Sequence, residues 1–325
     1  TRVKARVKAH ALREFIESRQ HVMIMGHSIS DTDAFGAAIG IYCAARVLGK
    51  KAQIVLDQVT SSLRPLKEGF TTEKGYPPDM FVSSERALEL TDYNTLVMLV
   101  DVTCPSHTEC PGLLKRTDSI VVFDHHRQSS EVISNPVLSY IEPYASSTCE
   151  MVAEVLQYFT ENIKLAPHEA DCIYAGILID TSNVMTKTGV RTFEAAAYLK
   201  RCGAEVTRVR KMLRNDMDAY KARAEVVRHA EVYRGAFAIS ICPADKIESP
   251  TIVGAQAADE LLNIVGIKAS FVLTEYQGKI YVSSRSIDEI NVQKIMERLG
   301  GGGHLNMAGC QLRDCTVSQA QRIIE

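Results

Sequence analysis

The sequence predicts an α/β fold: a mostly parallel sheet flanked by helices, followed by a smaller α/β domain at the C-terminal end. Three apolar runs, at residues 22–26, 95–100 and 119–123, support the first part of this prediction. Continuous runs of this kind are typical of strands that helices cover on both faces. Helical stretches separate the runs as in a βαβ series, and the pattern changes after about residue 230.

The first domain is expected to span residues 1–216. Its first helix is indicated by Val3, Val7, Ala11, Phe15 and Ile16, which recur at intervals of three and four. The further elements that we predict are strands 22–26, 52–57, 95–100 and 119–123, and helices 34–48, 84–90, 146–159, 167–179, 192–202 and 206–213. The segment 217–230 is charged, rich in alanine and free of Gly and Pro, which predicts an exposed connecting helix.

The second domain is expected to span residues 231–325. The turn Gln277-Gly278 between two apolar runs predicts a β-hairpin. The predicted elements are strands 236–242, 269–275, 279–285 and 308–312, and helices 252–264, 291–299 and one from residue 317.

Composition narrows the class of protein. Lys+Arg 37 against Asp+Glu 39 gives a net charge of -2, which argues against a surface for long nucleic acid. Nine cysteines stand singly, without a Cys-x-x-Cys pair, which argues against disulfides and a thiolate zinc site and favours the cytoplasm. No segment approaches the roughly 18 apolar residues of a membrane span, and no signal peptide opens the chain, so we expect no membrane contact by this chain.

Several metal-ligand residue types follow the predicted strands. Open parallel sheets bind ligands beyond the carboxyl ends of their strands, so side chains at these ends converge. The candidate ligands are His27, Asp31, Asp33, Asp101, His125 and Asp180. Four aspartates would balance the charge of two divalent ions. Oxygen and imidazole ligands without thiolate favour Mn²⁺, with Mg²⁺ or Co²⁺ as substitutes.

Each residue also has a structural interpretation. Asp101 alone is compatible with a polar strand end, the interpretation that we retain for Asp57. Asp31 or Asp33 alone would more often be the N-cap of the following helix. The combination is more specific than any one member.

At the level of motifs, the chain resembles a known family. Gly26-His-Ser-Ile-Ser-Asp-Thr-Asp-Ala34, Asp124-His-His126 and Gly300-Gly-Gly-Gly-His304 resemble the DHH/DHHA1 phosphoesterases. Residues 140–148, 188–195 and 290–297 are similar to the GdpP (YybT) cyclic-di-AMP phosphodiesterases. Ser30 departs from the proline that many relatives have before the first aspartate, which puts the rigidity of that loop in doubt.

The resemblance implies roles for these residues. One Mn²⁺ ion would be held by His27, Asp31 and Asp101, and the other by Asp33, Asp101, His125 and Asp180, with Asp101 bridging. Asp101 and His126 would be the catalytic residues. His126 would either lie behind the metal ligands or face a phosphate, and Asp124 would orient the motif by hydrogen bonding. Full-length relatives are membrane-anchored sensors with this part in the cytosol. Whether the chain forms a homodimer is left open.

The same resemblance implies a nucleotide grip in the second domain. Glycines allow backbone N–H groups to turn toward a phosphate, although a glycine run after a helix is more often a C-cap and linker. Arg285 would hold a phosphate, whereas a surface arginine is the alternative. The expected substrate contacts are Ser284, Arg285, Gly301, Gly302, Gly303 and His304.

The leading hypothesis is therefore a Mn²⁺-dependent bacterial phosphodiesterase that opens cyclic di-AMP, a second messenger, to linear pApA, with a hydroxide between the two ions as the nucleophile. One alternative is a nanoRNase or pAp phosphatase of the same superfamily, acting on short linear oligonucleotides. Another is a nucleotide-sensing module that binds without hydrolysis.

Overall fold

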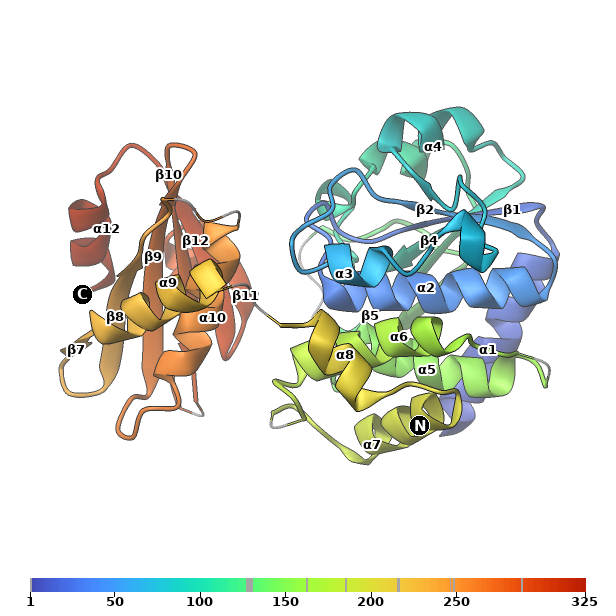
Figure 1. Ribbon diagram of the computed structural model, residues 1–325. Helices are drawn as coiled ribbons and strands as arrows, with labels where there is room; N and C mark the ends of the chain where they lie inside the picture. Colours follow the sequence, from blue (N-terminus) through green and yellow to red (C-terminus); the bar gives the residue numbers. More distant parts are fainter. Residues whose placement is uncertain are drawn as a thin grey trace. The chain divides into compact units, whose positions relative to one another are not determined.

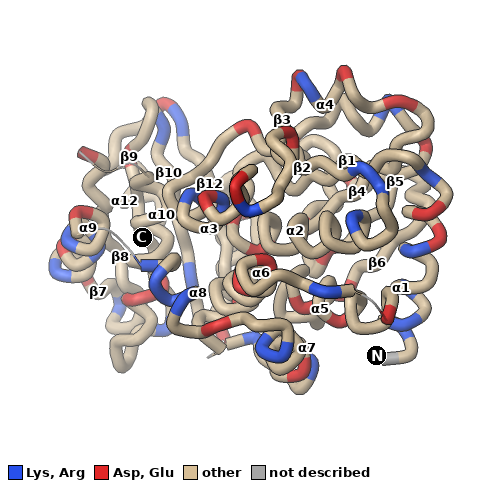
Figure 2. The backbone as a smooth tube through the Cα atoms, turned by 45° about the vertical axis from the view of Figure 1, so that its right-hand side comes forward, with Lys and Arg blue, Asp and Glu red and all other residues tan. Residues whose placement is uncertain are grey.

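The structure, a computed structural model, describes residues 2–126, 131–161, 163–184, 186–214, 217–245, 247, 249–287 and 289–325, without the side chains of Arg2 and His304. It divides into two compact units, Thr1–Arg214 and Asn215–Glu325, and each is described by itself (Figure 1). Basic and acidic residues are interspersed along both units (Figure 2), as the nearly balanced composition requires.

The first unit is built on a six-stranded sheet in which every neighbouring pair is parallel. In sheet order its strands are β3 (Phe81–Val82), β2 (Lys51–Val55), β1 (His21–Met25), β4 (Thr95–Val100), β5 (Ile120–Asp124) and β6 (Leu138–Ile141). The predicted parallel sheet is confirmed. The two edge strands were not predicted, because a run of two or four residues has too little pattern to be recognised.

Helices cover both faces of this sheet. Along β4, Met98 and Val100 pack in one core cluster with α1, α2, α5 and α6, while Val97 and Leu99 pack in another with α4. All four side chains are 0% exposed, which explains why the sequence is apolar at every position of this strand after Thr95. The helices are α1 (Arg2–Glu17), α2 (Thr32–Val47), α3 (Arg64–Lys67), α4 (Ser84–Leu90), α5 (Thr148–Phe159), α6 (Pro167–Asp180), α7 (Val190–Arg201) and α8 (Val206–Met212), with 3-10 turns at Thr72–Lys74, Pro105–His107 and Pro111–Lys115.

The first helix forms as predicted, but its buried face was partly misassigned. Val3 and Val7 are 77% and 60% exposed, whereas Leu12 and Ile16 are buried in the core. Valine at this end of the helix therefore does not mark the face that contacts the sheet.

The second unit contains a mixed six-stranded sheet. In sheet order its strands are β11 (Gly302–His304), β12 (Met307–Leu312), β10 (Lys279–Ser286), β9 (Ala269–Tyr276), β8 (Phe237–Cys242) and β7 (Glu231–Tyr233). Only β8 and β9 pair in parallel. The predicted hairpin is confirmed: Gln277 and Gly278 have φ angles of 51° and 71°, and positive φ at both central residues is the mark of a type I′ turn.

The segment expected as an exposed connecting helix is part of the second unit. It forms α9 (Met217–Arg228), and Val226 on it is 1% exposed, packed with Val253 and Ala257 of α10 (Pro250–Leu261). The remaining helices are α11 (Val292–Arg298) and α12 (Val317–Ile324). Within the described parts of the chain, no helix has both the length and the apolar character needed to cross a bilayer.

Candidate metal centre

The ends of the parallel strands bring the predicted ligands together. Asp101 directly follows β4, His125 directly follows β5, and His27 comes two residues after β1. Asp31 is the N-cap of α2, and its carboxylate accepts a hydrogen bond from the N–H of Ala34. The structural interpretation of Asp31 is thus also satisfied, and a carboxylate can serve both roles because each oxygen has two lone pairs.

The candidate residues form two groups, and Asp101, a member of the first, also has a donor atom within 4.8 Å of His125 in the second. His27, Asp31 and Asp101 have side-chain donor atoms within 4.8 Å of one another. The donor atoms of Asp33, His125 and Asp180 are equally close to one another. In the following, these are called the first and second group. All six sequence-predicted ligands lie in them.

Asp101 faces both groups. Its Oδ2 lies 3.7 Å from Nε2 of His27, and its Oδ1 lies 3.4 Å from Nε2 of His125. Asp101 has a φ of 61°, in the left-handed region that aspartate tolerates better than most residues. This backbone conformation turns the chain sharply at the end of β4, and such rare conformations cluster at functional sites.

The N-terminus of α5 holds Asp33. The backbone N–H groups of Thr148 and Cys149 donate to its two carboxylate oxygens at 2.7 and 2.8 Å. Burial, reinforced by the nearby charge of Asp180, still raises the pKa of Asp33 to about 7. Burial and the charge of Asp33 also raise the pKa of Asp101.

The surroundings of His125 favour its charged form. Burial disfavours its charged form, but the hydrogen bond to Asp180 and the charge of Asp33 prevail and raise the pKa of His125 to about 9. Its Nε2 lies 3.2 Å from Oδ2 of Asp180. The raised pKa values of Asp33, Asp101 and His125 reflect carboxylates that are crowded together out of water. A donor set of oxygen and nitrogen in such a place fits hard divalent ions.

His126 and Asp124 border these groups, and His126 itself has a donor atom within 4.8 Å of Asp101 and His125. Oδ1 of Asp124 accepts the backbone N–H of His126 at 3.0 Å and lies 2.7 Å from Nδ1 of the His126 ring. The same Nδ1 is 3.5 Å from Oδ1 of Asp101. Asp124 therefore contacts His126 through both its backbone and its ring, and the partly exposed His126 ring borders Asp101.

Several residues predicted to contact the nucleotide have hydrogen-bond partners within the second unit. The N–H groups of Gly300 and Gly301 donate to the carbonyl oxygens of Glu297 and Met296, and Gly300 has a φ of 77°, which together close the end of α11 in a Schellman motif. The Gly301 amide is therefore already hydrogen-bonded within the chain, and its expected contact with a phosphate stays a prediction. A Cβ on Gly301 would lie 2.1 Å from the carbonyl oxygen of Gly309, so glycine is required by strand packing.

The side chain of Ser284 also has a partner within the fold. It is 0% exposed, and its hydroxyl donates to the carbonyl oxygen of Ala308. Arg285 lies on the other face of β10, where its Nε donates to Asp259 at 2.7 Å. Gly302 and Gly303 pair with β12, and the side chain of His304 lies outside the described residues. The substrate contacts expected of Ser284, Arg285, Gly301, Gly302, Gly303 and His304 stay predictions.

Thr148 and Cys149 were not foreseen in the site. Ser147 caps α5, and its hydroxyl accepts the N–H of Glu150. Ser-x-x-Glu is a known signal for a helix start, and the first N–H groups of a helix need partners outside it. The signal was therefore in the sequence, but nothing there indicates that Asp33 is the partner.

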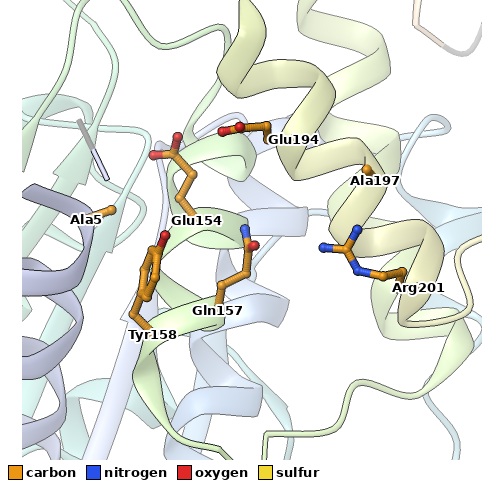
Figure 3. Close-up of a pocket in the computed structure, with 7 residues that line it drawn as sticks. All are labelled: Ala5, Glu154, Gln157, Tyr158, Glu194, Ala197 and Arg201. Carbon is orange, nitrogen blue, oxygen red and sulfur yellow. The ribbon is translucent and has the colours of Figure 1, made fainter. Parts of the chain in front are cut away.

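A separate hollow of about 350 Å³ lies between α1, α5 and α7 (Figure 3). Its lining residues are Ala5, Glu154, Gln157, Tyr158, Glu194, Ala197 and Arg201. None of the predicted site residues lines it, and it contains no imidazole, so we do not assign the chemistry to this hollow.

Two family profiles match this chain. The profile of the DHH family, N-terminal domain, matches residues 21–177, and that of the DHHA1 domain matches residues 237–325. The chain belongs to the DHH family. The first match contains every candidate ligand except Asp180, which lies three residues beyond it, and the second contains Arg285 and the glycine run.

Curated relatives match almost the whole chain. The cyclic-di-AMP phosphodiesterase GdpP of Geobacillus thermodenitrificans is 42% identical over 326 residues, covering 99% of this chain and 49% of that protein. The cyclic-di-AMP phosphodiesterase PdeA of Listeria monocytogenes is 38% identical over 325 residues, again covering 99% and 49%. The chain thus spans about half the length of these relatives.

Solved structures show the same fold. An exopolyphosphatase-related protein from Bacteroides fragilis has a TM-score of 0.82 at 18% identity, covering 95% of this chain and 92% of that one. RecJ from Thermus thermophilus, in complex with Mn²⁺, has a TM-score of 0.56 at 14% identity, covering 97% of this chain and 54% of that one. Metal binding is therefore known among proteins that share this fold.

Proposed function

We propose that this chain is a Mn²⁺-dependent phosphodiesterase that hydrolyses cyclic di-AMP to pApA in the cytoplasm of a bacterium. The observation that carries the proposal is the position of Asp101, whose two oxygens face different groups of ligand residues. An aspartate so placed suits a pair of ions better than a single one. The substrate is inferred from the names of relatives that are 38–42% identical over nearly the whole chain.

The donor set divides between two ions. His27, Asp31 and Asp101 would hold one ion, while Asp33, Asp101, His125 and Asp180 would hold the other. Bound there, two divalent ions would lower the pKa of a water between them and neutralise charge on the reacting phosphate. All six residues come from elements of the first unit, so this part of the chemistry needs no ligand from the second.

The chain's own residues prepare this site. Two backbone amides fix the carboxylate of Asp33, and burial keeps water from competing for it. His125 must lose its proton before its ring nitrogen can bind an ion, so ion binding should release protons at neutral pH. His126, oriented by Asp124, is placed beside Asp101, where it can contact a phosphate oxygen.

The substrate is tested by direct comparison. Cyclic di-AMP, pApA and pAp are incubated separately with the Mn²⁺-loaded protein, and products are separated by chromatography. We expect the largest kcat/KM for cyclic di-AMP, with pApA as its product. Faster turnover of pApA or pAp would instead indicate the oligoribonuclease or phosphatase alternative, and tight binding of cyclic di-AMP without turnover would indicate a sensing module.

A further inference from the structure

Thr148, the first residue of α5, contacts an aspartate of each group. Its backbone N–H donates to Oδ2 of Asp33 at 2.7 Å, and its hydroxyl donates to Oδ1 of Asp101 at 2.9 Å. Thr148 and Asp33 are 0% exposed and Asp101 is 3% exposed. Both hydrogen bonds are therefore shielded from water, and they join Asp33 of the second group to Asp101, the aspartate of the first group that faces both.

The hydroxyl determines how the Asp101 carboxylate is rotated. The terminal torsion of an aspartate is broad, so the backbone alone does not fix its two oxygens. With Oδ1 accepting the Thr148 hydroxyl, Oδ2 is left facing His27 of the first group at 3.7 Å. The shared aspartate can serve two ions only if each oxygen keeps its side. The Thr148 hydroxyl is the donor that maintains this orientation.

The hydroxyl is not needed to start the helix. The N-cap of α5 is Ser147, whose hydroxyl accepts the N–H of Glu150 at 3.0 Å. Thr148 follows the cap, and its side chain points instead to Asp101. A role limited to helix capping therefore does not explain the contact.

We propose that Thr148 is a positioning residue whose hydroxyl holds Asp101 across the two groups, so that both ions bind together. This inference rests on the two-ion site of the proposed function. Thr148 acts through Asp101 and is not itself a ligand. Losing a hydrogen bond behind a metal ligand typically weakens metal binding by about 10-fold to 100-fold.

The test compares two substitutions at this position. Thr148→Val removes the hydroxyl and nearly preserves the shape, whereas Thr148→Ser keeps the hydroxyl and removes the methyl group. The matched control is Thr117→Val, because Thr117 is also buried and its hydroxyl donates to Thr95 at the start of β4, at the other end of the strands. Each protein is freed of metal and titrated with Mn²⁺ by calorimetry. Electron paramagnetic resonance then distinguishes a spin-coupled Mn²⁺ pair from isolated ions.

The expected results separate positioning from folding. Thr148→Val should weaken binding of at least one ion by about 10-fold or more and lose the coupled-pair spectrum at two ions per chain. The Mn²⁺ dissociation constants of Thr148→Ser should stay within about threefold of those of the wild type, and those of Thr117→Val should equal the wild-type values. Thermal unfolding of the metal-free proteins shows whether each variant is folded.

Three outcomes would overturn the inference. Wild-type binding and a coupled spectrum in Thr148→Val would show that the hydroxyl is dispensable. Equal loss in Thr148→Val and Thr148→Ser would show that any change at this position disturbs the site, so the effect would not be specific to the hydroxyl. A wild-type protein that binds no Mn²⁺ would reject the two-ion site itself, and the proposed function with it.

Discussion

The close packing of other residues around Gly176 allows a test of how the helices position Asp33. Gly176 lies on α6, and a Cβ there would lie 2.4 Å from Sγ of Cys149 and 3.0 Å from Cα of Asp33. The same sulfur also sits close to Gly36 of α2, where a Cβ would be 2.7 Å from it. The Cys149 side chain therefore fills the space left by two glycines. In Gly176→Ala, the Cys149 side chain has no free space into which it can move away from the new methyl group.

The expected cost follows from these distances. Carbon contacts are optimal at about 3.5–4.0 Å, so the new methyl group would overlap the sulfur by about 1 Å. Such overpacking costs about 1–3 kcal/mol, and alanine's better helix propensity returns up to about 1 kcal/mol. We expect Gly176→Ala to lower the free energy of unfolding by about 2 kcal/mol and to weaken Mn²⁺ binding, because Asp33 must shift.

Urea unfolding of the metal-free protein, followed by circular dichroism, measures this cost. Adding Cys149→Ala removes the sulfur, so the double variant should lose much less stability relative to Cys149→Ala than Gly176→Ala loses relative to the wild type. Gly189→Ala is the control, since no atom lies within 4 Å of its added Cβ. Wild-type stability in Gly176→Ala, or no relief in the double variant, would refute the packing argument.

Three further predictions concern charge. Arg46 pairs with the fully buried carboxylate of Glu169, so Arg46→Ala should cost about 3 kcal/mol in urea unfolding, whereas Arg86→Ala, in an exposed pair, should cost about 0.5 kcal/mol or less; equal costs would contradict this. In the folded metal-free protein the pKa of Asp33 is raised to about 7 and that of His125 to about 9, so these two groups hold protons that they lose in the unfolded chain. The melting temperature should therefore fall as the pH rises from about 4 to about 9. A melting temperature that rises across this range would contradict the electrostatics of the site. Asp101→Ala should abolish hydrolysis at saturating Mn²⁺, and retained turnover would refute the assignment of Asp101.

Much of the fold follows from local sequence pattern. Strand β4 is apolar at nearly every position because both of its faces are buried, and α4 begins at Ser84 and ends at Leu90, as predicted. Strand β6 was missed because it has four residues and alternates between buried and half-buried positions. The burial of α9 was missed because only Val226 among its residues is fully buried, which a charged, alanine-rich sequence does not reveal.

The sequence also predicts that the candidate ligands converge, but it does not predict the hydrogen bonds that hold their carboxylates in place. His27, Asp101 and His125 follow strands of one parallel sheet, so architecture alone brings them together. The contact of Thr148 with Asp33 joins residues 115 positions apart and depends on how α5 packs against α2. In the glycine run, the sequence is compatible with both a ligand loop and a helix end. The backbone hydrogen bonds of Gly300 and Gly301 form the helix end, and the ligand contact stays a prediction.

The most direct test of the central claim is anomalous diffraction from crystals of this chain grown with Mn²⁺. The account predicts two anomalous peaks, one bounded by His27, Asp31 and Asp101, and the other bounded by Asp33, His125 and Asp180, with Asp101 between them. A single peak would contradict the role of Asp101 as a shared ligand. No peak at either position would contradict the metal centre.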